Sequence, residues 1–200
     1  MVVADNGGRV ICHDKPQVNS RSVSVSSTGK FVFIVSGTSS AYYLYKSDNF
    51  GDSFNQVLSG LTYQSIVQIS DSGQYVAVSG GSTSNIYTSS DLGNTFQSNT
   101  YTSSSSLDFK VSGSGQYLFS DAKYSTSFGQ SWNSWSSLFG FAFTGVGSTK
   151  DGKFVLGIYD NSGQAKGKLS SDYGNSFTTV GLIFFLILLL INLTITSHIN

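Results

Sequence analysis

An eight-residue motif recurs along this chain of 200 residues, and its period of about 40 residues is typical of a protein built from repeated structural units. The best copy, residues 89–96, reads Ser-Ser-Asp-Leu-Gly-Asn-Thr-Phe. It defines what we call the box motif, S-x-D-x-G-x-[ST]-[FW], and residues 170–177 keep every element of it. The Asp can accept hydrogen bonds from N–H groups a few residues on, the Gly allows positive φ, and the aromatic packs inward. We therefore expect each copy to be a structural turn.

Three further copies are less well preserved. The copies at 47–54 and 125–132 carry Asn49 and Ser127 at the Asp position, and a worn copy at 5–10 carries Val10 at the aromatic position. The box residues expected to have structural roles are Asp5, Gly7, Ser47, Asn49, Gly51, Ser89, Asp91, Gly93, Thr95, Phe96, Gly129, Trp132, Ser170, Asp172, Gly174 and Phe177.

A second motif, [ST]-x-x-G-[KQ]-[FY], follows each of the first four boxes, and we call it the Ser-Gly turn. Its distance from the box is nearly constant: 19 residues from Val10 to Gly29, 19 from Phe54 to Gly73, 19 from Phe96 to Gly115 and 20 from Trp132 to Gly152. Two motifs held at one distance indicate a true repeat, not a coincidence of low complexity.

Short strands are predicted between the motifs. Residues 30–35 and 75–78 are β-branched or aromatic, and 22–26 and 107–111 alternate with period two, as half-buried strands do. Each period then holds four strands, with the Ser-Gly turn between the first two and the box between the last two. No helical periodicity precedes residue 180. The fold class is therefore all-β.

The aligned repeats resemble the BNR/Asp-box superfamily of β-propellers over residues 3–180. That superfamily includes sialidases, xyloglucan-degrading glycosidases, sortilin-type receptors and photosystem II assembly factors. The resemblance implies a β-propeller of four-stranded antiparallel blades. It does not decide the function, because the same repeat occurs in enzymes and in binding proteins.

Sialidase activity is disfavoured because this chain lacks residues that sialidases need. Sialidases bind their substrate through three arginines and use a Tyr paired with a Glu, whereas this chain has only Arg9 and Arg21 and contains no Glu. A glycosidase that uses two Asp residues stays open, with Asp108 as the candidate because it lies on an alternating strand. The other interpretation of Asp108 is a polar residue on the outer side of that strand.

Topology predicts where a ligand would bind. The Ser-Gly turns and box motifs share one rim, so the blade-to-blade loops and the loops between second and third strands share the other, and function usually lies on such variable loops. Candidate ligand-face residues are Tyr63, Tyr101 and Trp135, with Asp108. Exposed aromatics there would suit sugar stacking or a protein contact. Alternatively, they fill apolar gaps between blades.

Composition argues against other chemistries. The formal net charge is zero and only 11% of residues are charged, so no basic surface for nucleic acid is expected. His13 and His198 are too far apart to predict a metal site, no cofactor motif is present, and the single Cys12 cannot form an internal disulfide.

Composition changes abruptly after Val180. We expect residues 1–181 to be the repeat domain and 182–200 an apolar tail, which opens with the run 182–191. Three explanations stay open for the tail: a membrane anchor, a buried last strand, or translation of noncoding sequence. No N-terminal apolar run of signal-peptide length is present, although a secreted or membrane-associated location is favoured.

Strand counting predicts a partial propeller. We expect the chain to start with the last strand of one blade, to continue with three full blades, and to end with the first three strands of another. These strands amount to about four blades in all. An open arc would expose strand edges and so favour self-association. The predicted function is a non-catalytic module that binds protein or glycan; the alternative is a fragment of a glycoside hydrolase.

Overall fold

The computed structural model describes residues 2–4, 10–12, 19–38, 41–62, 64–80, 85–100 and 109–181. Within these ranges the chain forms four antiparallel sheets of four strands and one separate two-stranded hairpin. Every four-stranded sheet, here called a blade, is a meander in which each strand pairs with its neighbours in sequence. The prediction of an all-β chain with four strands per repeat is confirmed.

The hairpin consists of β1 (Val2–Ala4) and β2 (Val10–Cys12). The first blade consists of β3 (Asn19–Val25), β4 (Val32–Gly37), β5 (Tyr42–Ser47) and β6 (Asn55–Leu61). The second consists of β7 (Val67–Ile69), β8 (Val76–Ser79), β9 (Asn85–Ser89) and β10 (Gln97–Thr100). The third consists of β11 (Phe109–Val111), β12 (Leu118–Ser120), β13 (Lys123–Ser125) and β14 (Asn133–Ser134). The fourth consists of β15 (Gly145–Ser148), β16 (Val155–Asn161), β17 (Gln164–Ser170) and β18 (Thr178–Val180).

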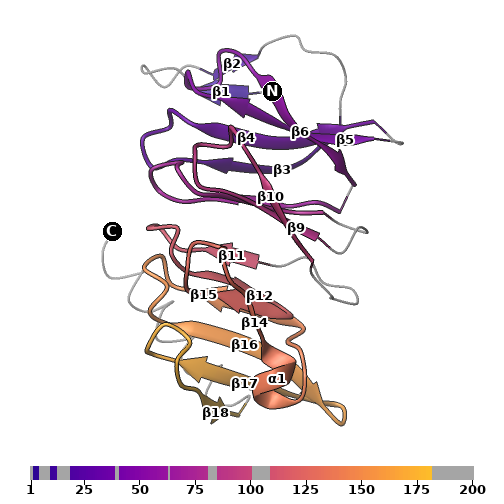
Figure 1. The fold of residues 1–200 in the computed structure, drawn as a ribbon, viewed down its shortest axis with the longest axis vertical. Coiled ribbons are helices and arrows are strands. Elements are labelled where there is room, and N and C mark those ends of the chain that lie inside the picture. Colours follow the sequence, from indigo (N-terminus) through magenta and orange to yellow (C-terminus); the bar gives the residue numbers. More distant parts are fainter. Residues whose placement is uncertain are drawn as a thin grey trace.

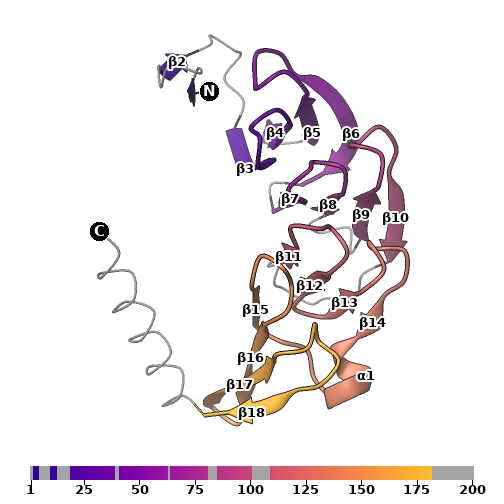
Figure 2. The same cartoon turned by 90° about the vertical axis from the view of Figure 1, so that its left-hand side faces the viewer.

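The blades stack side by side into a curved arc (Figures 1 and 2). Figure 2 shows the first strand of each blade, β3, β7, β11 and β15, on the concave side of the arc, and β6, β10, β14 and β18 toward the convex side. Consecutive first strands contact one another. A five-residue helix, α1 (Trp135–Phe139), follows β14 on the convex side.

The strand count at both ends of the chain differs from our prediction. The last blade has its own fourth strand, β18, which pairs with β17 through Gly167↔Val180 and Leu169↔Thr178. The prediction of only three strands there is wrong, because a fourth strand directly follows the box of this blade, as in the other blades. The start of the chain holds two strands, β1 and β2, rather than one.

The alternation predicted for β3 is present, but its apolar side faces away from the other blades. Ser22 and Ser24 point toward the second blade, where their Oγ atoms accept hydrogen bonds from the N–H groups of Val67 at 3.0 Å and Ile69 at 3.1 Å. The intervening Val23 and Val25 are exposed. The expectation of a strand with its apolar side buried is therefore wrong for β3.

All four described box motifs fold into the same turn. The Oγ of the first Ser accepts the N–H of the box Gly at 2.9 Å in Ser47–Gly51, 2.9 Å in Ser89–Gly93, 3.0 Å in Ser125–Gly129 and 2.9 Å in Ser170–Gly174. The residue before each Gly also has positive φ, between 58° and 63°. These four residues are Phe50, Leu92, Phe128 and Tyr173.

The second box shows why Asp suits the third position. Asp91 accepts the backbone N–H of Thr95 at 2.9 Å and its hydroxyl at 2.7 Å, and the hydroxyl of Ser89 at 2.7 Å. These bonds, led by the backbone N–H of Thr95, lower the pKa of Asp91 to about 2. Asp172 makes the matching bonds to Ser176, and its pKa is likewise lowered to about 2.

Each box turn is bound to the Ser-Gly turn of its own blade. The N–H of Phe50 donates to the carbonyl of Lys30 at 3.1 Å. The equivalent bonds of the other blades are Leu92 to Gln74, Phe128 to Gln116 and Tyr173 to Lys153, each at 3.0 Å. Both kinds of turn therefore lie on one rim, here called the turn rim, as predicted. The opposite rim is the loop rim.

Substituting Asp91 with Ala should destabilise the chain by about 1–2 kcal/mol at neutral pH, because the turn loses its central acceptor. The pKa of Asp91 is depressed in the folded state, so its contribution is fully present above the unfolded pKa of about 3.9. It is lost as the pH falls toward about 2. Urea unfolding of both proteins should show the difference shrinking between pH 7 and about pH 3.

The matched control is Asp48→Ala, which removes one exposed carboxylate from the first box at the position before Asn49. It should leave stability within about 0.5 kcal/mol of the unmodified chain. Equal destabilisation by both substitutions, or a difference that does not change with pH, would contradict the structural role of Asp91.

Candidate functional site

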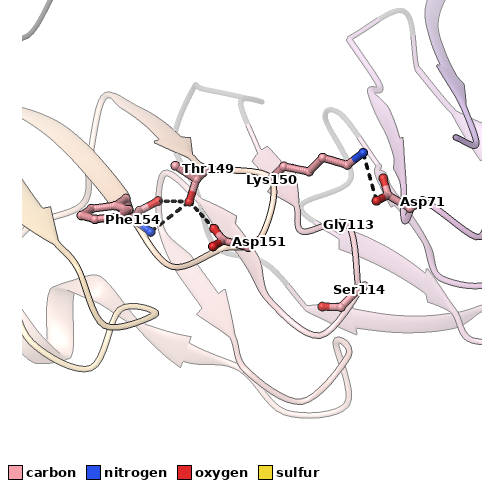
Figure 3. Close-up of a pocket in the computed structure, with 7 residues that line it drawn as sticks. All are labelled: Asp71, Gly113, Ser114, Thr149, Lys150, Asp151 and Phe154. Carbon is pink, nitrogen blue, oxygen red and sulfur yellow. Dashed lines mark hydrogen bonds and ion pairs between the residues drawn. The ribbon is translucent and has the colours of Figure 1, made fainter. Parts of the chain in front are cut away.

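A broad hollow opens on the turn rim where the turns of the second, third and fourth blades converge (Figure 3). Its volume is about 640 Å³. The residues that line it are Asp71, Gly113, Ser114, Thr149, Lys150, Asp151 and Phe154. They all belong to Ser-Gly turns, so the repeat itself brings them together.

An ion pair bridges the hollow. The Nζ of Lys150 in the fourth blade lies 3.0 Å from Oδ2 of Asp71 in the second blade (Figure 3). The side chains pass over the third blade at Gly113, where an added Cβ would lie only 2.6 Å from Asp71 Oδ2. Both side chains are well exposed, so water screens the pair and its contribution to stability is small, about 0–1 kcal/mol.

The second carboxylate of the hollow is part of its own turn. Asp151 Oδ1 accepts the hydroxyl of Thr149 at 2.6 Å and the backbone N–H of Lys153 at 3.0 Å. The bond from Thr149 is the main cause that lowers the pKa of Asp151. The carboxyl is therefore held as an anion near neutral pH.

The chemistry available in the hollow is recognition of polar groups. Asp71 and Asp151 offer hydrogen-bond acceptors, Lys150 offers a cation, and Phe154 offers an exposed ring. A general acid needs a pKa raised toward the working pH, whereas that of Asp151 is lowered. Asp151 is therefore poorly suited to act as a general acid near neutral pH.

Trp135, one of the predicted ligand-face residues, is fully buried. Its Nε1–H donates to the carbonyl of Ser120 at 2.7 Å. Its ring stacks on Tyr124 at 4.1 Å and meets Phe177 edge-on at 5.5 Å. Exposure of Trp135 was therefore a wrong expectation. The indole fills the gap between the third and fourth blades, in agreement with the alternative interpretation.

The remaining ligand-face residues, Tyr63, Tyr101 and Asp108, lie outside the described residues. So do Asp5 and Gly7 of the worn box, and residues 182–200. The other predicted box residues lie in the turns described above. Trp132 closes the third box, where its Nε1–H donates to the carbonyl of Gly129 at 3.0 Å.

The residues of the hollow are not among the sites predicted from the sequence. Three of these residues each directly follow the first hydroxyl residue of a Ser-Gly turn: Asp71, Gly113 and Lys150. They therefore fall in one column when the repeat sequences are aligned. That column was the available signal. Asp121, a buried carboxylate in the short connection between β12 and β13, was also missed.

In the part of the chain that the structure describes, no group of three or more His, Cys, Asp or Glu side chains is placed to hold a metal ion. In the same residues, no helix combines the length and the apolar character needed to cross a membrane.

No family model and no curated protein matches this chain. Among solved structures, it is similar to the GH74 enzyme from Niastella koreensis, with 18% identity and a TM-score of 0.61 over 90% of this chain and 28% of that one. It is also similar to the GH74 xyloglucanase from Xanthomonas campestris, with 11% identity and a TM-score of 0.61 over 88% of this chain and 27% of that one. A third structure, TolB from Acinetobacter baumannii, has 17% identity and a TM-score of 0.53 over 90% of this chain and 48% of that one.

At sequence identities this low, the similarity shows the fold alone. The chain spans less than a third of the length of the two GH74 proteins. Together with the four meandering sheets, these comparisons show that the fold is that of a β-propeller with four-stranded antiparallel blades.

Proposed function

We propose that this chain is a non-catalytic binding or scaffold module, a partial β-propeller of the BNR/Asp-box type whose ligand is a protein or a glycan. The observation that carries the proposal is the use of its carboxylates. Asp91, Asp151 and Asp172 are each engaged by their own turn, and their pKa values are lowered. Glycoside hydrolysis needs a carboxylic acid kept protonated near neutral pH, and these three groups are held in the opposite state.

The shared geometry of the four box turns supports the assignment to the Asp-box type. The Ser-to-Gly bond recurs in each turn even where Asn49 or Ser127 replaces Asp. Ser127 compensates in part, because its hydroxyl lies 2.7 Å from that of Ser131 and accepts the backbone N–H of Ser131 at 3.0 Å. This pattern fits a structural role of the turn, which forms with or without a carboxylate at its third position.

The ligand face in this proposal is the loop rim with Tyr63 and Tyr101, because loops vary while the turns repeat. The hollow on the turn rim is the competing place, and its polar groups suit hydroxyl-rich ligands. Substitutions on one rim therefore serve as controls for the other.

A second candidate function is part of a larger glycoside hydrolase. It is favoured by the similarity to two GH74 proteins, of which this chain spans 28% and 27%. In this case a catalytic carboxyl would be Asp108, with partner groups from outside this chain.

Xyloglucan is the probe that separates the two candidates. We expect the chain to be retarded in affinity electrophoresis on xyloglucan gels without releasing reducing sugar. Tyr63→Ala and Tyr101→Ala should each weaken retention about tenfold, the effect of losing one stacked ring. Lys150→Ala, on the turn rim, is the control and should leave retention unchanged. Release of reducing sugar that is abolished by Asp108→Asn would overturn the non-catalytic proposal.

We also propose that residues 182–200 tether the module to a membrane, since their apolar run is long enough to enter a bilayer interface. The 200-residue chain should co-sediment with phosphatidylcholine vesicles, while a variant ending at residue 181 should stay in the supernatant. Equal partitioning of the two proteins would refute the tether.

A further inference from the structure

The three contacts between blades are copies of one contact. In the first three blades, the aromatic residue that ends the Ser-Gly turn lies over the turn glycine of the next blade. An added Cβ at Gly73 would lie 2.7 Å from the ring of Phe31, and one at Gly152 would lie 2.9 Å from the ring of Tyr117. Tyr75 covers Gly115 in the same way. Only a residue without a side chain fits beneath each ring.

In two of the three contacts, the same aromatic residue also stacks on the box turn of the next blade. Tyr75 stacks on Phe128 with ring centroids 4.5 Å apart, and Tyr117 stacks on Tyr173 at 4.8 Å. Phe128 and Tyr173 are the positive-φ residues that precede the box Gly. Each blade therefore has a leading face with a glycine and a box residue, and a trailing face with an aromatic ring.

The first strand of each later blade completes the contact. Val67, Phe109 and Val146 occupy equivalent positions, three residues before the first hydroxyl of their Ser-Gly turns, and are only 0%, 3% and 4% exposed. They cluster with side chains of the preceding blade, as Val67 does with Phe33. Burial of this position thus depends on a blade in front of it.

The leading face of the first blade has every part of this contact except the covering ring. Val23, which is equivalent to Val67, is 61% exposed, and Phe50, which is equivalent to Phe128, is 50% exposed. The nearest atom to a Cβ added at Gly29 belongs to Phe50 itself, at 3.8 Å.

The trailing face of the fourth blade has the complementary part. Phe154, which is equivalent to Phe31, Tyr75 and Tyr117, is 45% exposed. Among the described residues, the exposed large hydrophobic side chains are Val23, Val25, Phe50, Leu138 and Phe154. All but Leu138 lie on these two end faces.

A series of backbone hydrogen bonds links the same turns. The N–H of Ser27 donates to the carbonyl of Asp71 at 2.8 Å, that of Asp71 to Gly113 at 2.8 Å, and that of Gly113 to Lys150 at 2.6 Å. These four residues are equivalent in the repeat. Continuing the series would join the N–H of Lys150 to the carbonyl of a residue equivalent to Ser27.

We propose that two copies of this chain associate head to tail, with the trailing face of one fourth blade on the leading face of the partner's first blade. In this contact, Phe154 of one copy covers the partner's Gly29 and stacks on the partner's Phe50. The N–H of Lys150 donates to the carbonyl of the partner's Ser27. The contact is heterologous, because different surfaces meet. A second copy is the partner because one chain carries both surfaces of this contact, the leading face of its first blade and the trailing face of its fourth. The chain makes the same contact three times between its own blades.

Two substitutions test the proposal on the full chain. Phe154→Asp removes the trailing ring, and Phe50→Asp removes its platform while keeping a residue type that tolerates positive φ. In analytical ultracentrifugation, the unmodified chain should show mass above that of the 21.4 kDa monomer, rising with concentration. Each variant should associate at least about thirtyfold more weakly, as expected for an aromatic at the centre of an interface.

Mixing the two variants is the decisive measurement. The variant Phe50→Asp keeps an intact trailing face, and Phe154→Asp keeps an intact leading face, so the equimolar mixture should form a one-to-one pair with affinity near that of the unmodified contact. Leu138→Asp, which is equally exposed but lies on α1, is the matched control and should associate normally. Circular dichroism melting confirms that each variant is folded.

Three results would overturn the proposal. They are an unmodified chain that stays monomeric at all concentrations, variants that associate as well as the unmodified chain, and a mixture of the folded variants that fails to pair. The last result would indicate a contact in which both copies use the same surface.

Discussion

The fit of one aromatic ring over one glycine is the contact on which the arc depends. It repeats at Phe31 on Gly73, Tyr75 on Gly115 and Tyr117 on Gly152. Each blade alone is a small, thin sheet with two apolar faces, which cannot exclude water without neighbours. The ring and the glycine set how closely successive blades approach. The buried second strands of the first three blades, with first-strand residues such as Val67 and Val146, then form the core. Curvature follows from repeating one asymmetric contact.

Polar turns carry the rest of the structure on the turn rim. Hydroxyl and carboxyl groups of the boxes satisfy backbone N–H groups that no strand can pair. This explains how a chain with only 11% charged residues can hold many tight turns. It also explains why the carboxylates of these turns are poor candidates for acid catalysis: the bonds that hold the turn stabilise the anion.

The sequence predicted turns and strands correctly where a residue contacts residues that are close to it along the chain. The box at 89–96 and the Ser-Gly turns involve partners within about five residues, so spacing alone located them and the strands between them. Prediction failed where the environment came from another blade. Trp135 looked like an exposed loop residue, yet it is buried between two blades. The valines of β3 are exposed because no blade among the described residues covers them. The residues of the hollow share a column of the repeat, but only stacking of the blades brings Asp71 and Lys150 together.

The amino-acid sequence by itself determined the all-β class, the four strands of each blade and the rim on which the turns lie. These properties follow from hydrogen bonds and periodicities within a single repeat. Tertiary structure alone decided which side chains are buried, where the hollow opens and which faces end the arc. Those properties depend on how neighbouring blades pack, and residues that are equivalent in sequence, such as Phe31 and Phe154, differ only in whether a neighbour is present.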